Sequence, residues 1–158
     1  MHRSYIGVGS NIGDARANVE KAYQALAEAK GVRRARLSPL FRTAPVGYLD
    51  QDWFVNAVVE LFVDFDGMEL FSLCQSIEMK MKRIREERWG PRIIDLDVLW
   101  IDGVTIDEDD LKIPHARAHE RAFVLKPLAC FDSELILHGR SVLDWLHKCD
   151  DQELEECV

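Results

Sequence analysis

The sequence predicts an α+β fold, a ferredoxin-like β-α-β-β-α-β core with helices packed on an antiparallel sheet. Two observations predict this fold. Alternating or β-branched residues indicate strands, and apolar residues at helical spacing fill two of the intervals between them. The segments expected as strands are residues 3–9, 32–41, 53–65 and 93–101. Without an internal repeat or a linker, residues 1–158 are expected to form a single domain.

Capping residues and apolar spacing predict the helices. Asp14 can cap a helix that ends by Gly31, and residues 68–84 form a second periodic segment. We expect a short helix over residues 120–129, ended loosely by Pro127, and a final helix capped by Ser141. The positions expected to be buried in the first, second and final helices are Val19, Ala22, Tyr23, Leu26; Leu70, Leu73, Cys74, Ile77, Met81, Ile84; and Val142, Trp145, Leu146, Cys149.

The segments outside the main helices and strands are predicted to form turns, loops and exposed surface. Asp102-Gly103 is a hairpin signal after the strand at 93–101. Residues 43–52 form a loop long enough to be functional or mobile. Arg33, Arg34 and Arg36 are interpreted as a solvated face, and residues 150–158 as a frayed acidic tail.

Composition excludes several classes of protein. The formal net charge of -8 argues against a general nucleic-acid binder, which needs a broad excess of Lys and Arg. The 4 cysteines lack C-x-x-C spacing, so a zinc cage is not expected. No apolar run reaches the length of a membrane span. We expect a cytoplasmic protein, as a monomer or weak dimer.

Two alternating aspartates suggest a metal site. Asp95 and Asp97 are two residues apart in a predicted strand, so both carboxylates project from one face. Carboxylates this close repel each other, and a hard cation such as Mg²⁺ relieves the repulsion. The preceding segment is strongly cationic, which suits a polyphosphate that carries its own metal. Its basic residues are Lys80, Lys82, Arg83, Arg85, Arg88 and Arg92.

The same segment carries a family resemblance. Residues 83–97 read R-x-R-x-x-R-W-G-P-R-x-x-D-L-D, which resembles the signature of the 6-hydroxymethyl-7,8-dihydropterin pyrophosphokinases. Residues 5–14, 41–47, 54–57 and 113–128 resemble further blocks of that family in the same order. The resemblance implies a Mg²⁺-dependent diphosphokinase of folate biosynthesis. It would move pyrophosphate from ATP to the pterin alcohol and release AMP, with a functional hand-over of the product to a pteroate synthase.

The resemblance also implies roles for individual residues, each with a structural alternative. It implies two Mg²⁺ ions on Asp95 and Asp97, and catalytic roles for Arg83, Arg92 and Asp97, the last as proton acceptor. The implied ATP-binding residues are Gln75, Glu78, Arg85, Arg88, Trp89, His115 and Arg121. The implied pterin-binding residues are Thr43, Ala44, Val46, Phe54, Asn56 and Phe123. Taken singly, the arginines could form surface ion pairs, the phenylalanines could be core residues and Asn56 a structural amide.

Some positions depart from the family pattern, and two other classes compete. The departures are Phe41, Lys82, Asp110, Lys112 and Ala116.

An RNA-recognition motif shares the order of elements but should carry an aromatic strand that is absent here. A hydrolase or nucleotidyl-sugar transferase could use D-x-D with His115 and His119, although D-x-D alone is a weak motif. Gly7 and Gly9 share a strand face and are expected to let another backbone approach.

Overall fold

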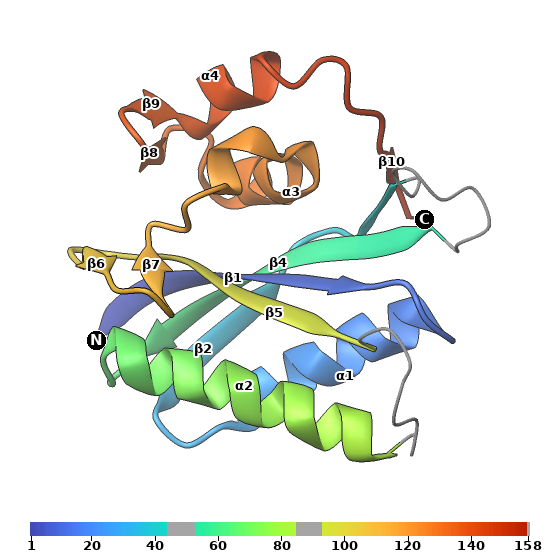
Figure 1. Ribbon diagram of the computed structural model, residues 1–158, viewed down its shortest axis with the longest axis vertical. Helices are drawn as coiled ribbons and strands as arrows, with labels where there is room; N and C mark the ends of the chain where they lie inside the picture. The colour runs from blue at the N-terminus through green and yellow to red at the C-terminus, as the bar shows by residue number, and fades with distance from the viewer. Residues whose placement is uncertain (44–52, 85–92, 158) are drawn as a thin grey trace.

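A computed structural model describes residues 1–43, 53–84 and 93–157. The described chain forms three layers, with a central sheet between two pairs of helices (Figure 1). The sheet strands are β1 (His2–Ser10), β2 (Val32–Leu37), β3 (Phe41–Thr43), β4 (Phe54–Val63), β5 (Asp95–Ile101) and β10 (Glu155–Glu156). The helices are α1 (Ala15–Glu28), α2 (Gly67–Ile84), α3 (Ala122–Asp132), α4 (Val142–His147) and the 3-10 turn η1 (Ala118–Glu120).

The sheet topology confirms the predicted α+β core. β1 lies between β4 and β5, β2 pairs with β4, and all of these pairings are antiparallel. β3 extends the sheet beyond the end of β2, also on β4, and β10 adds an edge beside β3. The helices α1 and α2 cover one face, and α3 and α4 cover the other (Figure 1).

Each face of the sheet has its own core. Ile6, Val59 and Leu96 pack with apolar residues of α1 and α2 on one side. Tyr5, Val58 and Leu99 pack with α3 and α4 on the other. Alternate residues of a strand point to opposite faces, so β1, β4 and β5 contribute to both cores.

Local capping produces the helices where the sequence predicts them. The Asp14 carboxylate accepts from the Ala17 N–H at 3.1 Å, and the Ser141 hydroxyl accepts from the Asp144 N–H at 3.1 Å. α1 ends at Glu28 rather than at Gly31, whose φ of 92° instead turns the chain into β2. Among the described residues, no helix is long and apolar enough to cross a membrane.

Three predictions about chain connections are wrong. Pro127 does not end α3 but lies inside it, and the helix continues to Asp132. The turn after β5 does not make a hairpin with it, because β6 (Ile106–Asp107) pairs with β7 (Lys112–Ile113). A second small hairpin joins β8 (Ile136–Leu137) to β9 (Arg140–Ser141). The tail is not frayed over residues 150–157, because Glu155–Glu156 form β10 against β3.

One predicted solvated arginine has a buried partner. Glu60 is 3% exposed, and its Oε1 accepts from Arg36 Nε at 2.9 Å and Nη2 at 2.7 Å. Its other oxygen accepts from the Tyr5 hydroxyl at 3.0 Å. Burial and the adjacent carboxylate raise the pKa of Tyr5, so its hydroxyl remains a donor. Arg36 therefore compensates a charge inside the sheet, unlike the exposed pair of Arg33 with Asp64.

Candidate active site

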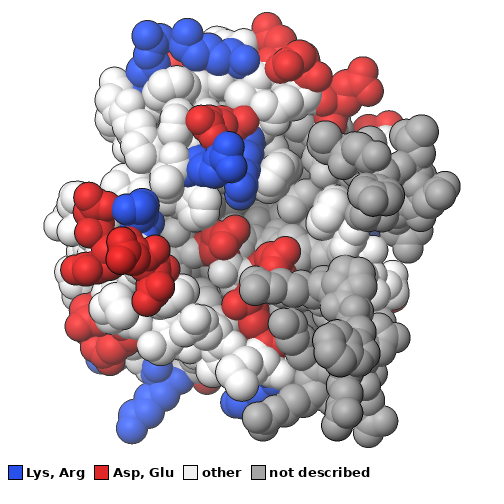
Figure 2. Space-filling view, in the orientation of Figure 1, with Lys and Arg blue, Asp and Glu red and all other residues white. Residues whose placement is uncertain are grey.

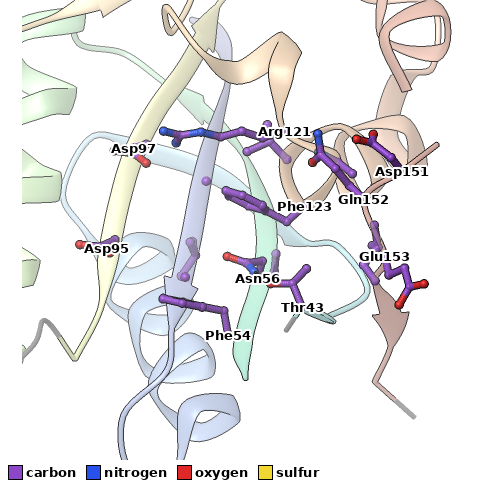
Figure 3. A pocket seen from close by; sticks show the side chains of 17 residues that line it. Thr43, Phe54, Asn56, Asp95, Asp97, Arg121, Phe123, Asp151, Gln152 and Glu153 are labelled. Carbon is purple, nitrogen blue, oxygen red and sulfur yellow. Dashed lines mark hydrogen bonds between the residues drawn. The ribbon is translucent and has the colours of Figure 1, made fainter. Parts of the chain in front are cut away.

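The two aspartates of β5 lie at one end of the sheet and line a cavity of about 690 Å³ (Figure 3). Asp95 is opposite Gly9 in β1, and Asp97 is opposite Gly7. Leu96, between them, is 6% exposed and points into the opposite core. The predicted shared face of Asp95 and Asp97 is confirmed. A cavity of this volume is within the range of small-molecule sites.

An acidic residue of α2 holds this strand in place. Glu78 Oε2 accepts from the Leu96 N–H at 3.1 Å, which fixes the backbone between the two aspartates. Nearby, burial raises the pKa of Cys74 to about 12, and the charges of Glu78 and Asp97 add to the shift. The Cys74 thiol therefore stays protonated. Gln75 is exposed on the same helix, and neither Gln75 nor Glu78 lines the cavity.

The wall formed by β3 and β4 carries three residues of the predicted pterin site. Thr43, Phe54 and Asn56 all line the cavity. Asn56 is 7% exposed and donates from Nδ2 to Thr43 Oγ1 at 3.3 Å. Asn56 also lies opposite Gly9 in the β1–β4 register. The amide is thus fixed in position at the cavity wall.

The opposite wall comes from the start of α3. Phe123 projects into the cavity, and Figure 3 shows Arg121 extending above it toward the side where Asp97 lies. The Arg121 guanidinium carbon is 5.7 Å from the centre of the Phe123 ring. A cation over an aromatic face is weakly attractive, so this contact helps to orient both side chains. The cavity therefore has an aromatic part and a charged part.

His115 lies next to the charged part without lining the cavity itself. Its backbone N–H donates to the Leu99 carbonyl at 2.8 Å, and its Nδ1 accepts from the Arg117 N–H at 3.1 Å. An accepting Nδ1 leaves the proton on Nε2, which is then a donor. Burial lowers the pKa of His115, while the negative charge of Asp97 acts in the opposite direction. At neutral pH His115 is therefore a neutral donor.

The sequence did not indicate one wall of the cavity. Asp151, Gln152, Glu153 and Leu154, from the tail predicted to be frayed, line the cavity beside α3. Their composition is acidic and polar, and no periodicity marks them as a structural segment. Gly7, Val8 and Gly9 of β1, with Ala57 of β4, complete the floor.

Several predicted site residues cannot be placed in this geometry. Ala44, Val46, Arg85, Arg88, Trp89 and Arg92 lie outside the described residues. Arg83 belongs to the last turn of α2, and its side chain also lies outside what the structure describes. The roles of these residues remain predictions.

The fold and the cavity together fit a protein that binds a small molecule. Both faces of the sheet are covered by helices, so the open sheet face of an RNA-recognition motif is not available (Figure 1). Figure 2 shows acidic side chains at the centre of the visible face with basic ones close by, and no continuous basic stripe in its described part. Within residues 1–43, 53–84 and 93–157, no three His, Cys, Asp or Glu side chains gather as metal ligands.

Comparisons with known proteins identify the kind of enzyme. Residues 5–133 match the model of the 7,8-dihydro-6-hydroxymethylpterin-pyrophosphokinase (HPPK) family. The chain is 43% identical over 155 residues to the 2-amino-4-hydroxy-6-hydroxymethyldihydropteridine pyrophosphokinase of Methylorubrum extorquens, covering 98% of each chain. The Pseudomonas aeruginosa protein of the same name is 36% identical over 156 residues, covering 98% of this chain and 96% of its own. The chain belongs to the HPPK family.

A solved structure supports the fold. The Plasmodium falciparum chain described as HPPK-DHPS wild type with SDX-DHP superposes with a TM-score of 0.69 at 14% identity. The match covers 94% of this chain and 43% of that one, so this chain spans less than half of the solved protein. At this identity the likeness concerns the fold alone.

Proposed function

We propose that the cavity binds the pterin ring between Phe54 and Phe123 and the ATP phosphates beside Asp95 and Asp97. As a member of the HPPK family, the enzyme transfers pyrophosphate from ATP to 6-hydroxymethyl-7,8-dihydropterin in folate biosynthesis. The products are AMP and the pterin diphosphate. The observation that carries the site proposal is that aromatic, amide and carboxylate side chains line a single cavity.

The aromatic part of the cavity suits a flat heterocycle. Phe54 and Phe123 come from opposite walls and offer ring faces for stacking (Figure 3). Asn56 carries both a donor and an acceptor, and Thr43 fixes its orientation. A pterin edge presents donors and acceptors side by side, so one oriented amide can distinguish it from a plain aromatic ring. We assign the remaining edge to Ala44 and Val46, which follow β3 in the sequence.

The charged part suits Mg²⁺ and phosphate. Asp95 and Asp97 provide carboxylate oxygens on one strand face, the ligand type that Mg²⁺ prefers. Since the described residues offer no complete protein cage, substrate phosphates and water would supply the other ligands. These residues fit the proposed pair of Mg²⁺ ions. Such ions would neutralise phosphate charge that otherwise repels the attacking oxygen.

The protein's own groups would position the reactants. Arg121, which lines the cavity at the start of α3, can donate to phosphate oxygens. The Nε2–H of His115, beside the cavity, is proposed as a second donor. We propose that Asp97 accepts the proton of the pterin hydroxyl. Arg83 and Arg92 are proposed to stabilise the negative charge that develops on the transferred group. Gln75 and Glu78 are proposed on the adenosine side, with Arg85, Arg88 and Trp89 completing the ATP site.

The chemistry of the product and the composition of the relatives indicate which enzyme uses the pterin diphosphate next. A pterin diphosphate has a good leaving group, so its consumer should be a synthase that displaces pyrophosphate. The solved HPPK-DHPS chains and the Bifunctional protein FolKE of Lactococcus lactis join an HPPK-like part to further sequence. We propose that this product is handed to a pteroate synthase in the cytoplasm, and that the enzyme acts as a monomer or weak dimer.

Substituting Phe123 tests the position of the pterin. Phe123→Ala removes one stacking face, and loss of such a face costs about 1–3 kcal/mol, or roughly fivefold to 150-fold in pterin affinity. The dissociation constant of ATP alone should change little. Phe62→Ala, on β4 outside the cavity, is the matched control. Unchanged pterin affinity in Phe123→Ala would place the pterin elsewhere.

A further inference from the structure

Residues 150–157, here called the C-terminal strap, connect α4 to the edge of the sheet. At the sheet end the Cys157 N–H donates to the Leu40 carbonyl at 2.7 Å. Arg42 donates to Glu155 Oε2 from Nε at 3.0 Å and from Nη2 at 2.9 Å. Between α4 and these anchors, the strap passes the start of α3 and forms a wall of the cavity (Figure 3).

One side chain of the strap makes two hydrogen bonds to the backbone of the site. Gln152 Oε1 accepts from the Ala122 N–H at 2.9 Å. Gln152 Nε2 donates to the Glu120 carbonyl at 2.9 Å. These two backbone groups belong to the peptide units on either side of Arg121. A single amide therefore restrains both peptide planes that determine φ and ψ of Arg121.

This arrangement replaces a missing helix cap. Arg121 is the N-cap residue of α3, has φ -121° and ψ 111°, and makes no side-chain capping bond. A helix start normally uses a short polar N-cap side chain to satisfy its first N–H groups. Here the N-cap position holds a long cation that lines the cavity, and Gln152 satisfies the Ala122 N–H from 30 residues away. The guanidinium is left available to the cavity.

We propose that Gln152 is a positioning residue for the transfer reaction, acting through Arg121 and Phe123. Fixing the backbone at Arg121 directs its guanidinium over the charged part of the cavity. The first turn of α3 then directs Phe123, two residues later, across the aromatic part (Figure 3). One strap residue thus sets the relative placement of a phosphate donor and a stacking ring. This inference rests on the proposed pterin and phosphate sites.

The test combines substitutions of Gln152 with separate measurements of stability, binding and turnover. Gln152→Ala removes both hydrogen bonds, and Gln152→Met removes them while keeping the bulk of the side chain. Asp150→Asn is the control, because Asp150 is exposed at the start of the strap and does not line the cavity. Pterin binding to the folded protein, the KM for each substrate and kcat are measured well below the midpoint of thermal unfolding.

We expect both Gln152 variants to weaken pterin binding and to lower kcat, each by about tenfold or more, since small misplacements of binding groups are costly. Asp150→Asn should behave as the wild type. Wild-type pterin affinity and kcat in folded Gln152→Met would overturn the proposal and leave Gln152 as a structural tie. If Gln152→Ala fails to fold, Gln152→Met decides. Failure of the wild-type protein itself to bind the pterin would instead overturn the proposed function.

Discussion

Gly9 and Asn56 face each other across β1 and β4, and the glycine leaves the space that the amide occupies. A Cβ atom at position 9 would lie 2.7 Å from Asn56 Oδ1, closer than such atoms approach in proteins. Gly9 is thus required by a side chain of the cavity wall. This corrects the expectation of a close backbone approach at Gly7 and Gly9, since the nearest atoms to a Cβ on Gly7 also belong to a side chain, that of Leu99.

Gly9→Ala should therefore damage pterin recognition through Asn56. We expect the dissociation constant of the pterin to rise about tenfold, the cost of one misplaced hydrogen bond in a buried site. The double variant Gly9→Ala/Asn56→Ala provides the control, because residues in contact show non-additive effects. If Gly9→Ala raises the dissociation constant of the pterin by the same factor in the Asn56→Ala background as in the wild type, Gly9 does not act through Asn56.

The aspartates of β5 should be required for turnover and not for folding. Asp95→Asn and Asp97→Asn should each lower kcat at least about 100-fold, as loss of one preorganised charge-stabilising group does in other enzymes. Far-UV circular dichroism should be unchanged, because removing one of two neighbouring carboxylates relieves repulsion. Asp107→Asn is the control, since Asp107 pairs with Lys112 in a separate hairpin. Wild-type rates in both site variants would refute the assignment.

The sequence predicted those parts of the structure that depend on neighbouring residues. Asp14 caps α1 through a residue three positions away, and the period of two in β5 places Asp95 and Asp97 on one face. The family motifs assigned Thr43, Phe54, Asn56 and Phe123 to a pterin site and Arg121 to an ATP site. In the structure all five line one cavity. Capping rules, strand periodicity and family motifs were sufficient to predict the positions of these residues.

The strap was not predictable from such rules. Its contacts join Gln152 to Ala122, 30 residues away, and Glu155 to Arg42, 113 residues away. Its acidic sequence has the composition of an unstructured tail. The strap is ordered by contacts with an edge strand and a helix start that distant parts of the chain supply. The buried partner of Arg36 was missed for the same reason, because Glu60 lies on a neighbouring strand.

The arginines of β2 should differ in their effect on stability. Arg36→Ala leaves the buried Glu60 carboxylate with only the Tyr5 hydroxyl, and should lower the free energy of unfolding by about 1–3 kcal/mol. Arg33→Ala removes an ion pair whose side chains are both exposed, and should cost about 0–1 kcal/mol. Urea unfolding measures both. Equal losses in the two variants would show that Glu60 does not depend on Arg36.

His115 should make stability depend on pH on the acidic side of neutrality. Its folded-state pKa lies below 6.5, so the unfolded chain binds more protons between the two values. The free energy of unfolding should rise as pH increases toward the unfolded pKa and then become level. His115→Gln should reduce this rise between pH 5 and 7, whereas His2→Gln at the exposed N-terminus should not. An identical rise in His115→Gln would contradict the neutral, half-buried imidazole.

The nucleotide product tests the central claim most directly. The enzyme is incubated with ATP, Mg²⁺ and 6-hydroxymethyl-7,8-dihydropterin, and the nucleotides and pterins are separated and quantified. Transfer of pyrophosphate predicts one AMP for each pterin diphosphate, with both products lost in Asp97→Asn. Formation of ADP with a pterin monophosphate would contradict the account, because attack would then have occurred at the terminal phosphate of ATP.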